Sequence, residues 1–335
     1  MLVLGSSSLA PLAQTNTNIS IAIILMLVGF LALYYGAEWL VEGAVSLANH
    51  LNISKVVAGV ILVAFGTSAP ELFVNSIAAV RGEAGFALSN ISGSNLANLL
   101  IGFGLCAILT SVLVNVKAFQ LDLIFFSVAP IIIFVTMFLL PPLESGERQL
   151  PLWSVLTLFA AFAVYLYQTY GRMMESEDEE EDGDLPILTS VGYFVLGVVL
   201  LYVGGEMTVR QATGIATALG VPDAILGLTI VALGTSIPDI TASVVAARQN
   251  ETAIAVGNLL GSNIFNVLFV IPMTLLFSWG PLSAENSVMY GYGVVVLASL
   301  GFFALVRVRP NLSRPAGIVL ITSYLLYIVY RVVSL

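Results

Sequence analysis

Long apolar stretches separated by short polar segments organise the chain. A membrane-spanning helix needs about 20 mostly apolar residues, and ten stretches are long enough to form one. The pattern predicts an all-α polytopic membrane protein with ten transmembrane helices. The predicted spans are 19–47, 55–80, 84–113, 119–141, 151–170, 187–218, 223–247, 251–279, 288–307 and 315–333.

The sequence repeats itself at a constant offset of 168 residues. The stretch GTSAPE at 66–71 returns as GTSIPD at 234–239, and GSNLAN at 93–98 returns as GSNIFN at 261–266. The chain is therefore a duplication with two repeats of five predicted spans. We expect a first repeat at 1–170 with its motif region at 59–100, a linker at 171–186, and a second repeat at 187–335 with its motif region at 227–268.

The distribution of Lys and Arg predicts the orientation of the spans. With the amino end outside, seven of the 11 basic residues lie on the cytoplasmic side. Because each half holds an odd number of spans, the two repeats would then enter the membrane from opposite faces. Inverted-topology repeats are typical of secondary transporters, whose ion or substrate site lies at the midplane between the repeats.

Composition supports a membrane protein, since 59% of the residues are hydrophobic and only 9% are charged. Soluble domains carry about 25% charged residues. The net charge of −9 comes from the run 175–184, in which eight of ten residues are acidic. We expect this linker to be a solvated tether in the cytoplasm, and we expect no nucleic-acid partner. A calcium-regulatory role for the linker stays open, although it lacks the spaced ligands of an ordered calcium loop.

Residues 1–18 contain no Lys or Arg and only a brief apolar stretch, so we expect a polar tail and not a signal peptide. With a short middle loop and no transit peptide, the pattern favours an integral, multi-pass protein of a prokaryotic plasma (inner) membrane. A monomer is plausible. The single cysteine, Cys106, lies in an apolar run and is expected to be a packing residue.

The first motif places oxygen ligands next to a proline. Pro70 cannot donate a backbone hydrogen bond and its ring presses on the carbonyl of Gly66, so we expect a bend that frees carbonyls around Ala64. Thr67 and Glu71 are four residues apart and share a helix face. A carboxylate within lipid is costly, and its duplication at matched positions indicates a functional site.

The second motif adds amides, which offer oxygen atoms without charge. Ser94 and Asn98 are four apart, as are Ser262 and Asn266. A set with two carboxylates, Thr, Ser and Asn oxygens and neither sulfur nor imidazole suits calcium or sodium. When a divalent ion leaves, monovalent ions or protons must replace its charge. Helix-packing hydrogen bonds remain an equal alternative for the neighbouring Asn95 and Asn263.

These motifs resemble those of the sodium/calcium exchanger family, within the cation/calcium antiporter superfamily, whose two repeats carry GTS-x-P-[ED] and GSN-x-x-N. The resemblance covers roughly 36–100 and 204–268 and indicates a prokaryotic-type member. It implies a sodium/calcium antiporter that works by alternating access, with the first and sixth spans sliding across a static core. It implies neither an enzyme nor a cofactor. The ligands it implies are Glu71, Asp239, Thr67, Thr235, Ala64, Ala232, Ser68, Ser236, Ser94, Ser262, Asn98 and Asn266.

Potassium-dependent relatives have Asp where this chain has Asn266, so the resemblance also implies potassium independence. His50 is expected to face solvent or the membrane interface. Glu38 and Glu206 match across the repeats and could be gates or interfacial side chains. Calcium/proton antiport, a cation channel and a non-transporting bundle remain alternatives to sodium/calcium exchange, since neighbouring carboxylates can also carry protons.

Overall fold

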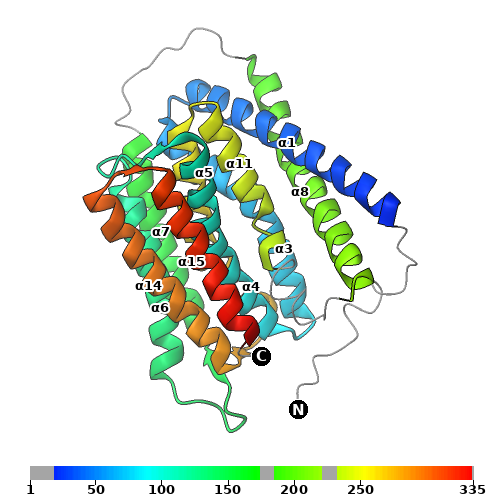
Figure 1. Cartoon of the computed structure of the whole chain (residues 1–335). Coiled ribbons are helices and arrows are strands. Elements are labelled where there is room, and N and C mark those ends of the chain that lie inside the picture. The colour runs from blue at the N-terminus through cyan, green and yellow to red at the C-terminus, as the bar shows by residue number, and fades with distance from the viewer. Residues whose placement is uncertain (1–18, 174–184, 221–231, 334–335) are drawn as a thin grey trace.

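The structure is a computed structural model that describes residues 19–173, 185–220 and 232–333. It is a bundle of helices (Figure 1). Within the described ranges the chain also forms two short antiparallel ribbons. The elements of the first repeat are α1 (Ile19–His50), α2 (Lys55–Val57), η1 (Ala58–Val63), α3 (Ala64–Val80), α4 (Ala84–Ala97), η2 (Asn98–Gly102), α5 (Phe103–Thr110), β1 (Val112–Leu113), α6 (Gln120–Leu139), β2 (Arg148–Leu150) and α7 (Ser154–Met173). Those of the second are α8 (Ile187–Ala218), α10 (Ala232–Gly234), α11 (Ile237–Arg248), α12 (Thr252–Phe265), η4 (Asn266–Val270), α13 (Ile271–Phe277), β3 (Leu282–Ala284), α14 (Asn286–Val308), β4 (Asn311–Leu312) and α15 (Arg314–Val333).

Eight helices within the described residues are long and apolar enough to cross a membrane, and they confirm eight of the predicted spans. The predicted span 151–170 corresponds to α7, a 20-residue helix that is not among the eight. The predicted span 223–247 begins outside the described residues. The structure therefore confirms a helical polytopic membrane protein, while ten spans remain a prediction.

One span is shorter than its apolar stretch predicts. The predicted span 84–113 ends at Thr110, because Ser111 adopts the left-handed conformation with φ of 54°. The next two residues form β1, which pairs with β4 so that Val112 faces Leu312. A second ribbon pairs β2 with β3. Each ribbon joins a loop of one repeat to a loop of the other.

Helices α1 and α8 pack against each other along glycines. Gly29 faces Gly204, whereas Gly43 faces Phe194, so the two helices run antiparallel. A Cβ added at Gly197 would lie 2.5 Å from the backbone nitrogen of Leu40. Such contact needs small residues, as in other membrane helix pairs. Figure 1 shows this pair along one flank of the bundle.

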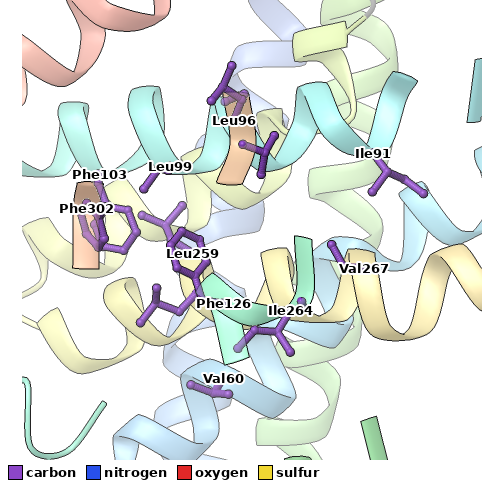
Figure 2. Close-up of a cluster of buried hydrophobic side chains, with 14 of the residues drawn as sticks. Val60, Ile91, Leu96, Leu99, Phe103, Phe126, Leu259, Ile264, Val267 and Phe302 are labelled. Atoms are coloured by element: carbon purple, nitrogen blue, oxygen red, sulfur yellow. The ribbon is translucent and has the colours of Figure 1, made fainter. Parts of the chain in front are cut away.

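The core joins the two repeats through α4, η2 and α12. Figure 2 shows Leu96 and Leu99 from the first repeat among Leu259 and Ile264 from the second. All four side chains are at most 1% exposed. An amide on the neighbouring faces of these helices, such as that of Asn98 or Asn258, is thus held within a packed protein interior, away from lipid.

A buried ion pair joins α6 to α7. Arg172 donates to both carboxylate oxygens of Asp122, at 2.7 and 3.0 Å, and Tyr165 donates to Asp122 at 2.9 Å.

We expect Asp122→Asn to lower the free energy of unfolding by about 2 kcal/mol. The guanidinium of Arg172 loses its charged partner but stays partly solvated, since its side chain is 22% exposed. Thermal unfolding in detergent measures this. The matched control Glu251→Gln breaks a pair whose side chains are 26% and 20% exposed, so it should cost below about 1 kcal/mol. Equal losses would contradict the prediction.

Candidate ion-binding site

The two proline motifs fold differently although their sequences match. In the first repeat α3 runs without a break from Ala64 to Val80 with Pro70 inside it, following the π-helical segment η1. In the second repeat α10 ends at Gly234, a turn follows, and Pro238 lies in the first turn of α11. An interruption of the helix beside the proline is therefore found in the second repeat, whereas the helix of the first repeat continues through Pro70.

The second motif of each repeat also carries a π-helical segment. The segments η2 and η4 begin at Asn98 and Asn266, the last residues of GSNLAN and GSNIFN. Such widened turns leave backbone groups with altered partners and are frequent at functional sites. Both asparagines are fully buried.

The two acidic side chains are each fully buried and held by a serine of their own repeat. Ser94 donates to Glu71 Oε1 at 3.2 Å, and Ser262 donates to Asp239 Oδ1 at 2.9 Å. These contacts are equivalent under the 168-residue offset. Each repeat thus places one serine hydroxyl against its own carboxylate.

Further hydrogen bonds connect the repeats across the site. Asn98 Nδ2 donates to Asp239 Oδ2 at 2.7 Å, and Ser236 donates to Ser94 Oγ at 2.8 Å. Asn266 Nδ2 lies 3.4 Å from the same Ser94 oxygen. The structure thus brings both acidic residues and five of the predicted Ser and Asn ligands into one network.

Thr67 joins the network through its hydroxyl. Its closest acceptor is Asn258 Oδ1 at 2.9 Å, and Val63 O lies 3.0 Å away. The carbonyl of Ala64, a predicted ligand, is 3.4 Å from the same hydroxyl. Thr235 instead reaches Asn90 Oδ1 at 3.3 Å. Both threonines therefore contact an asparagine of the opposite repeat.

Two of the predicted ligands remain to be described, Ala232 and Ser68. Ala232 begins α10, close to the part of the chain that the structure does not describe. Ser68 is fully buried, and its hydroxyl has no hydrogen-bond partner among the described residues.

Helix α8 contacts both proline motifs. A Cβ at Gly66 would lie 2.8 Å from Val198, and one at Gly234 would lie 2.7 Å from Val209. The glycines of both motifs therefore leave room for side chains of one helix.

Several buried oxygen atoms at the site lack any hydrogen-bond partner within the described residues. They are Glu71 Oε2, Asn98 Oδ1 and Asn266 Oδ1. A buried acceptor left unpaired costs about 1–3 kcal/mol, and a bound cation removes that cost. Three or more His, Cys, Asp or Glu side chains do not cluster anywhere in the described ranges. The donor set thus consists of two carboxylates with neutral oxygens, which suits calcium or sodium.

Sequence reasoning missed Asn75, Asn90, Ser243 and Asn258 as parts of the network. All are at most 4% exposed, and their side chains bond to the motifs. The signal that could have found two of them is the offset itself, because Asn90 and Asn258 are amides kept at matched positions within apolar stretches.

The other candidates lie outside this network. Glu38 accepts a hydrogen bond from Tyr34 at 2.5 Å, and Glu206 is exposed. His50 is exposed at the end of α1, as expected, with Nε2 2.8 Å from the carbonyl of Leu185. Cys106 is buried, as its apolar context predicts.

The comparison with protein families decides to which family the chain belongs. The model of the family described as sodium/calcium exchanger protein matches residues 21–171 and 189–333, one match in each half of the chain. The chain belongs to the sodium/calcium exchanger family. Both family matches contain one copy of each motif, so the network described above joins the two matched halves.

Exchanger relatives match almost the entire chain. It is 31% identical to a putative antiporter CaxA from Alkalimonas amylolytica over 92% of this chain and 97% of that one. It is 28% identical to the sodium/calcium exchanger MaX1 from Methanosarcina acetivorans over 93% and 98%. A solved structure of the sodium-calcium exchanger NCX_Mj, soaked with sodium and without calcium, matches with a TM-score of 0.77 at 29% identity, covering 93% of this chain and 99% of that chain. These matches support a prokaryotic-type member of the family.

Proposed function

We propose that this protein is a secondary antiporter that exchanges sodium for calcium by alternating access, with its ion site at the membrane midplane between the two repeats. The observation that carries the proposal is the buried cluster of oxygen atoms around Glu71 and Asp239, three of which have no partner within the described residues. The related exchangers support the identity of the ions.

The charge of the cluster accounts for exchange. Two carboxylates balance one divalent cation, so calcium can bind within a low-dielectric interior at little net charge. If calcium left alone, two uncompensated carboxylates would remain buried, which is costly. Sodium ions entering as calcium leaves avoid this state. The proposed protein is accordingly a transporter without a cofactor and not an enzyme, as its membership of an exchanger family supports.

We assign ligand roles to the residues of the four motif copies. Glu71 and Asp239 supply charge, and Asn98 and Asn266 close the middle of the site. Serine hydroxyls would bind flanking sodium ions, and backbone carbonyls near the two threonines would complete the shell. The full proposed set is Glu71, Asp239, Thr67, Thr235, Ser68, Ser236, Ser94, Ser262, Asn98, Asn266, Ala64 and Ala232.

The proposed topology has ten spans in two inverted repeats, with the amino end outside and the acidic linker in the cytoplasm of a prokaryotic cell. Two observations support it. Helices α1 and α8 occupy equivalent positions in the repeats and run antiparallel. Hydrogen bonds such as Ser94 to Glu71 and Ser262 to Asp239 recur at the 168-residue offset.

Potassium cotransport is not part of the proposal. Position 266 is an asparagine, which bonds to Asn95 Oδ1 at 3.1 Å and contributes no charge. With two carboxylates in the cluster, a calcium ion is already balanced, and no third acidic group remains to attract an additional monovalent ion.

Calcium uptake by proteoliposomes tests the proposal. We expect an outward sodium gradient to drive radiocalcium uptake equally with and without potassium, because sodium replaces calcium in the cluster. A pH gradient alone serves as the comparison. Uptake driven only by protons would favour calcium/proton antiport, and calcium flux that needs no counter-ion would indicate a channel. Either result would refute sodium/calcium exchange.

A further inference from the structure

Two chains of buried hydrogen bonds connect the threonine of one repeat to the acidic residue of the other. In the first, Thr67 donates to Asn258 Oδ1 at 2.9 Å, and Asn258 Nδ2 donates to the backbone oxygen of Asp239 at 2.9 Å. The same Nδ2 group lies 2.9 Å from Ser243 Oγ. All four residues are at most 1% exposed. We call this chain the Asn258 relay.

The second chain runs in the opposite direction and has one more side chain. Thr235 donates to Asn90 Oδ1 at 3.3 Å, and Asn90 Nδ2 donates to Asn75 Oδ1 at 3.3 Å. Asn75 Nδ2 then donates to the backbone oxygen of Glu71 at 2.7 Å. We call this chain the Asn90 relay. Asn75 occupies the position that Ser243 holds in the other repeat, 168 residues later.

The proposed ligand set includes none of the amides in these relays. Their polar atoms bond to the motifs, so they act through the residues that face the ion. Because they are buried, removing one side chain leaves its partners without hydrogen bonds, which lets the helices that carry them shift. The relays therefore hold the proline motif of each repeat against the acidic residue of the other.

We propose that Asn258, together with the Asn90–Asn75 pair, positions the two carboxylates relative to each other and thereby sets the preference of the site for calcium over sodium. The proposal rests on the ion exchange proposed above. A divalent ion with six to eight oxygen ligands needs both carboxylates at once. A sodium ion is balanced by one carboxylate and tolerates a change in their separation.

The two relays differ in length, so the two carboxylates of the site are held by different numbers of hydrogen bonds. Asp239 has both carboxylate oxygens bonded and its backbone oxygen held directly by Asn258. Glu71 has one bonded oxygen, and its backbone oxygen is reached through Asn75. Asn258 therefore holds the more rigid carboxylate, and its loss should have the larger effect.

Ion-dependent thermal unfolding of the purified full-length protein tests the relays. Titrating calcium and sodium separately gives an apparent Kd for each ion from the rise in Tm. We expect Asn258→Ala to raise the calcium Kd about tenfold and the sodium Kd less than about threefold. A smaller rise is expected for Asn90→Ala. Equal changes for both ions, or no change in a folded variant, would overturn the proposal.

A second pair of variants keeps the test decisive if Asn258→Ala fails to fold. Asn75→Ala should weaken calcium binding, whereas Asn75→Ser reproduces the residue at position 243 and lets Asn90 approach the backbone of Glu71 directly. We expect Asn75→Ser to return the calcium Kd to within about twofold of the unmodified protein. Identical Kd values for the two variants would overturn the proposal.

Ser127→Ala is the matched control, since Ser127 is a buried residue of α6 whose hydroxyl has no partner among the described residues. It should leave both Kd values unchanged. The unmodified protein separates the two hypotheses. If calcium does not raise its Tm, the proposed exchange function fails. If calcium does so equally in the protein and its relay variants, only the relays fail.

Discussion

Glu71→Gln is expected to abolish sodium-driven calcium uptake while the protein stays folded. The substitution removes one of two buried charges, so a divalent ion would bind with one carboxylate in a low-dielectric interior. We expect the initial rate of radiocalcium uptake to fall by at least about 100-fold, which corresponds to about 2.7 kcal/mol. Stability should change by less than about 1 kcal/mol, because Ser94 can still donate to the amide oxygen of Gln.

Glu144→Gln is the matched control for this experiment. Glu144 is an exposed glutamate in the segment between α6 and β2, so the same chemical change occurs outside the bundle. Uptake should match the unmodified protein. Persistent uptake by a folded Glu71→Gln variant would show that the carboxylate is not a calcium ligand and would remove the basis of the proposed mechanism.

Gly197→Ala is expected to be the most destabilising single-methyl change in the α1–α8 pair. The added Cβ would lie 2.5 Å from Leu40 N and 2.8 Å from Gly36 O. Both are backbone atoms, which cannot move aside as the end of a side chain can. The helices must separate along their length, so we expect a loss of about 3 kcal/mol in the free energy of unfolding and a severe loss of uptake.

The same helix provides the control. A Cβ at Gly192 meets no atom within 4 Å, so Gly192→Ala adds helix propensity without a clash. We expect it to be neutral or to stabilise the protein by up to about 1 kcal/mol. Thermal unfolding and calcium uptake of both variants would be measured side by side. If Gly197→Ala behaved like Gly192→Ala, the close approach of α1 to α8 would not be needed.

Much of the helical architecture could be predicted, because an apolar stretch of 20 or more residues has few alternatives in lipid. The predicted spans 55–80 and 187–218 have the same limits as the helical segments Lys55–Val80 and Ile187–Ala218. The span 84–113 was predicted too long. Its apolar pattern continues past Thr110, but the helix ends at the left-handed Ser111, and the next two residues pair with β4. Such pairing joins residues about 200 positions apart and leaves no local signal.

The two proline motifs also show that matching local sequence does not fix the same local structure. The matching sequences GTSAPE and GTSIPD predict similar bends, yet α3 is continuous and the second motif has a turn at Thr235 and Ser236. Local propensity cannot distinguish two nearly identical stretches. Packing against the rest of the bundle decides between them, and the same helix α8 meets the two motifs with different side chains, Val198 and Val209.

The sequence by itself determined the class of protein, the duplication and the chemistry of the candidate ligands. These follow from composition, spacing and the cost of a carboxylate in lipid, which are properties of local sequence. The tertiary structure decided which groups meet. Asn98 bonds to Asp239 across 141 positions and Thr67 to Asn258 across 191, because glycines let helices of different repeats approach closely. Hydrogen bonds of this kind depend on distances between helices, and no pattern along one helix specifies those distances.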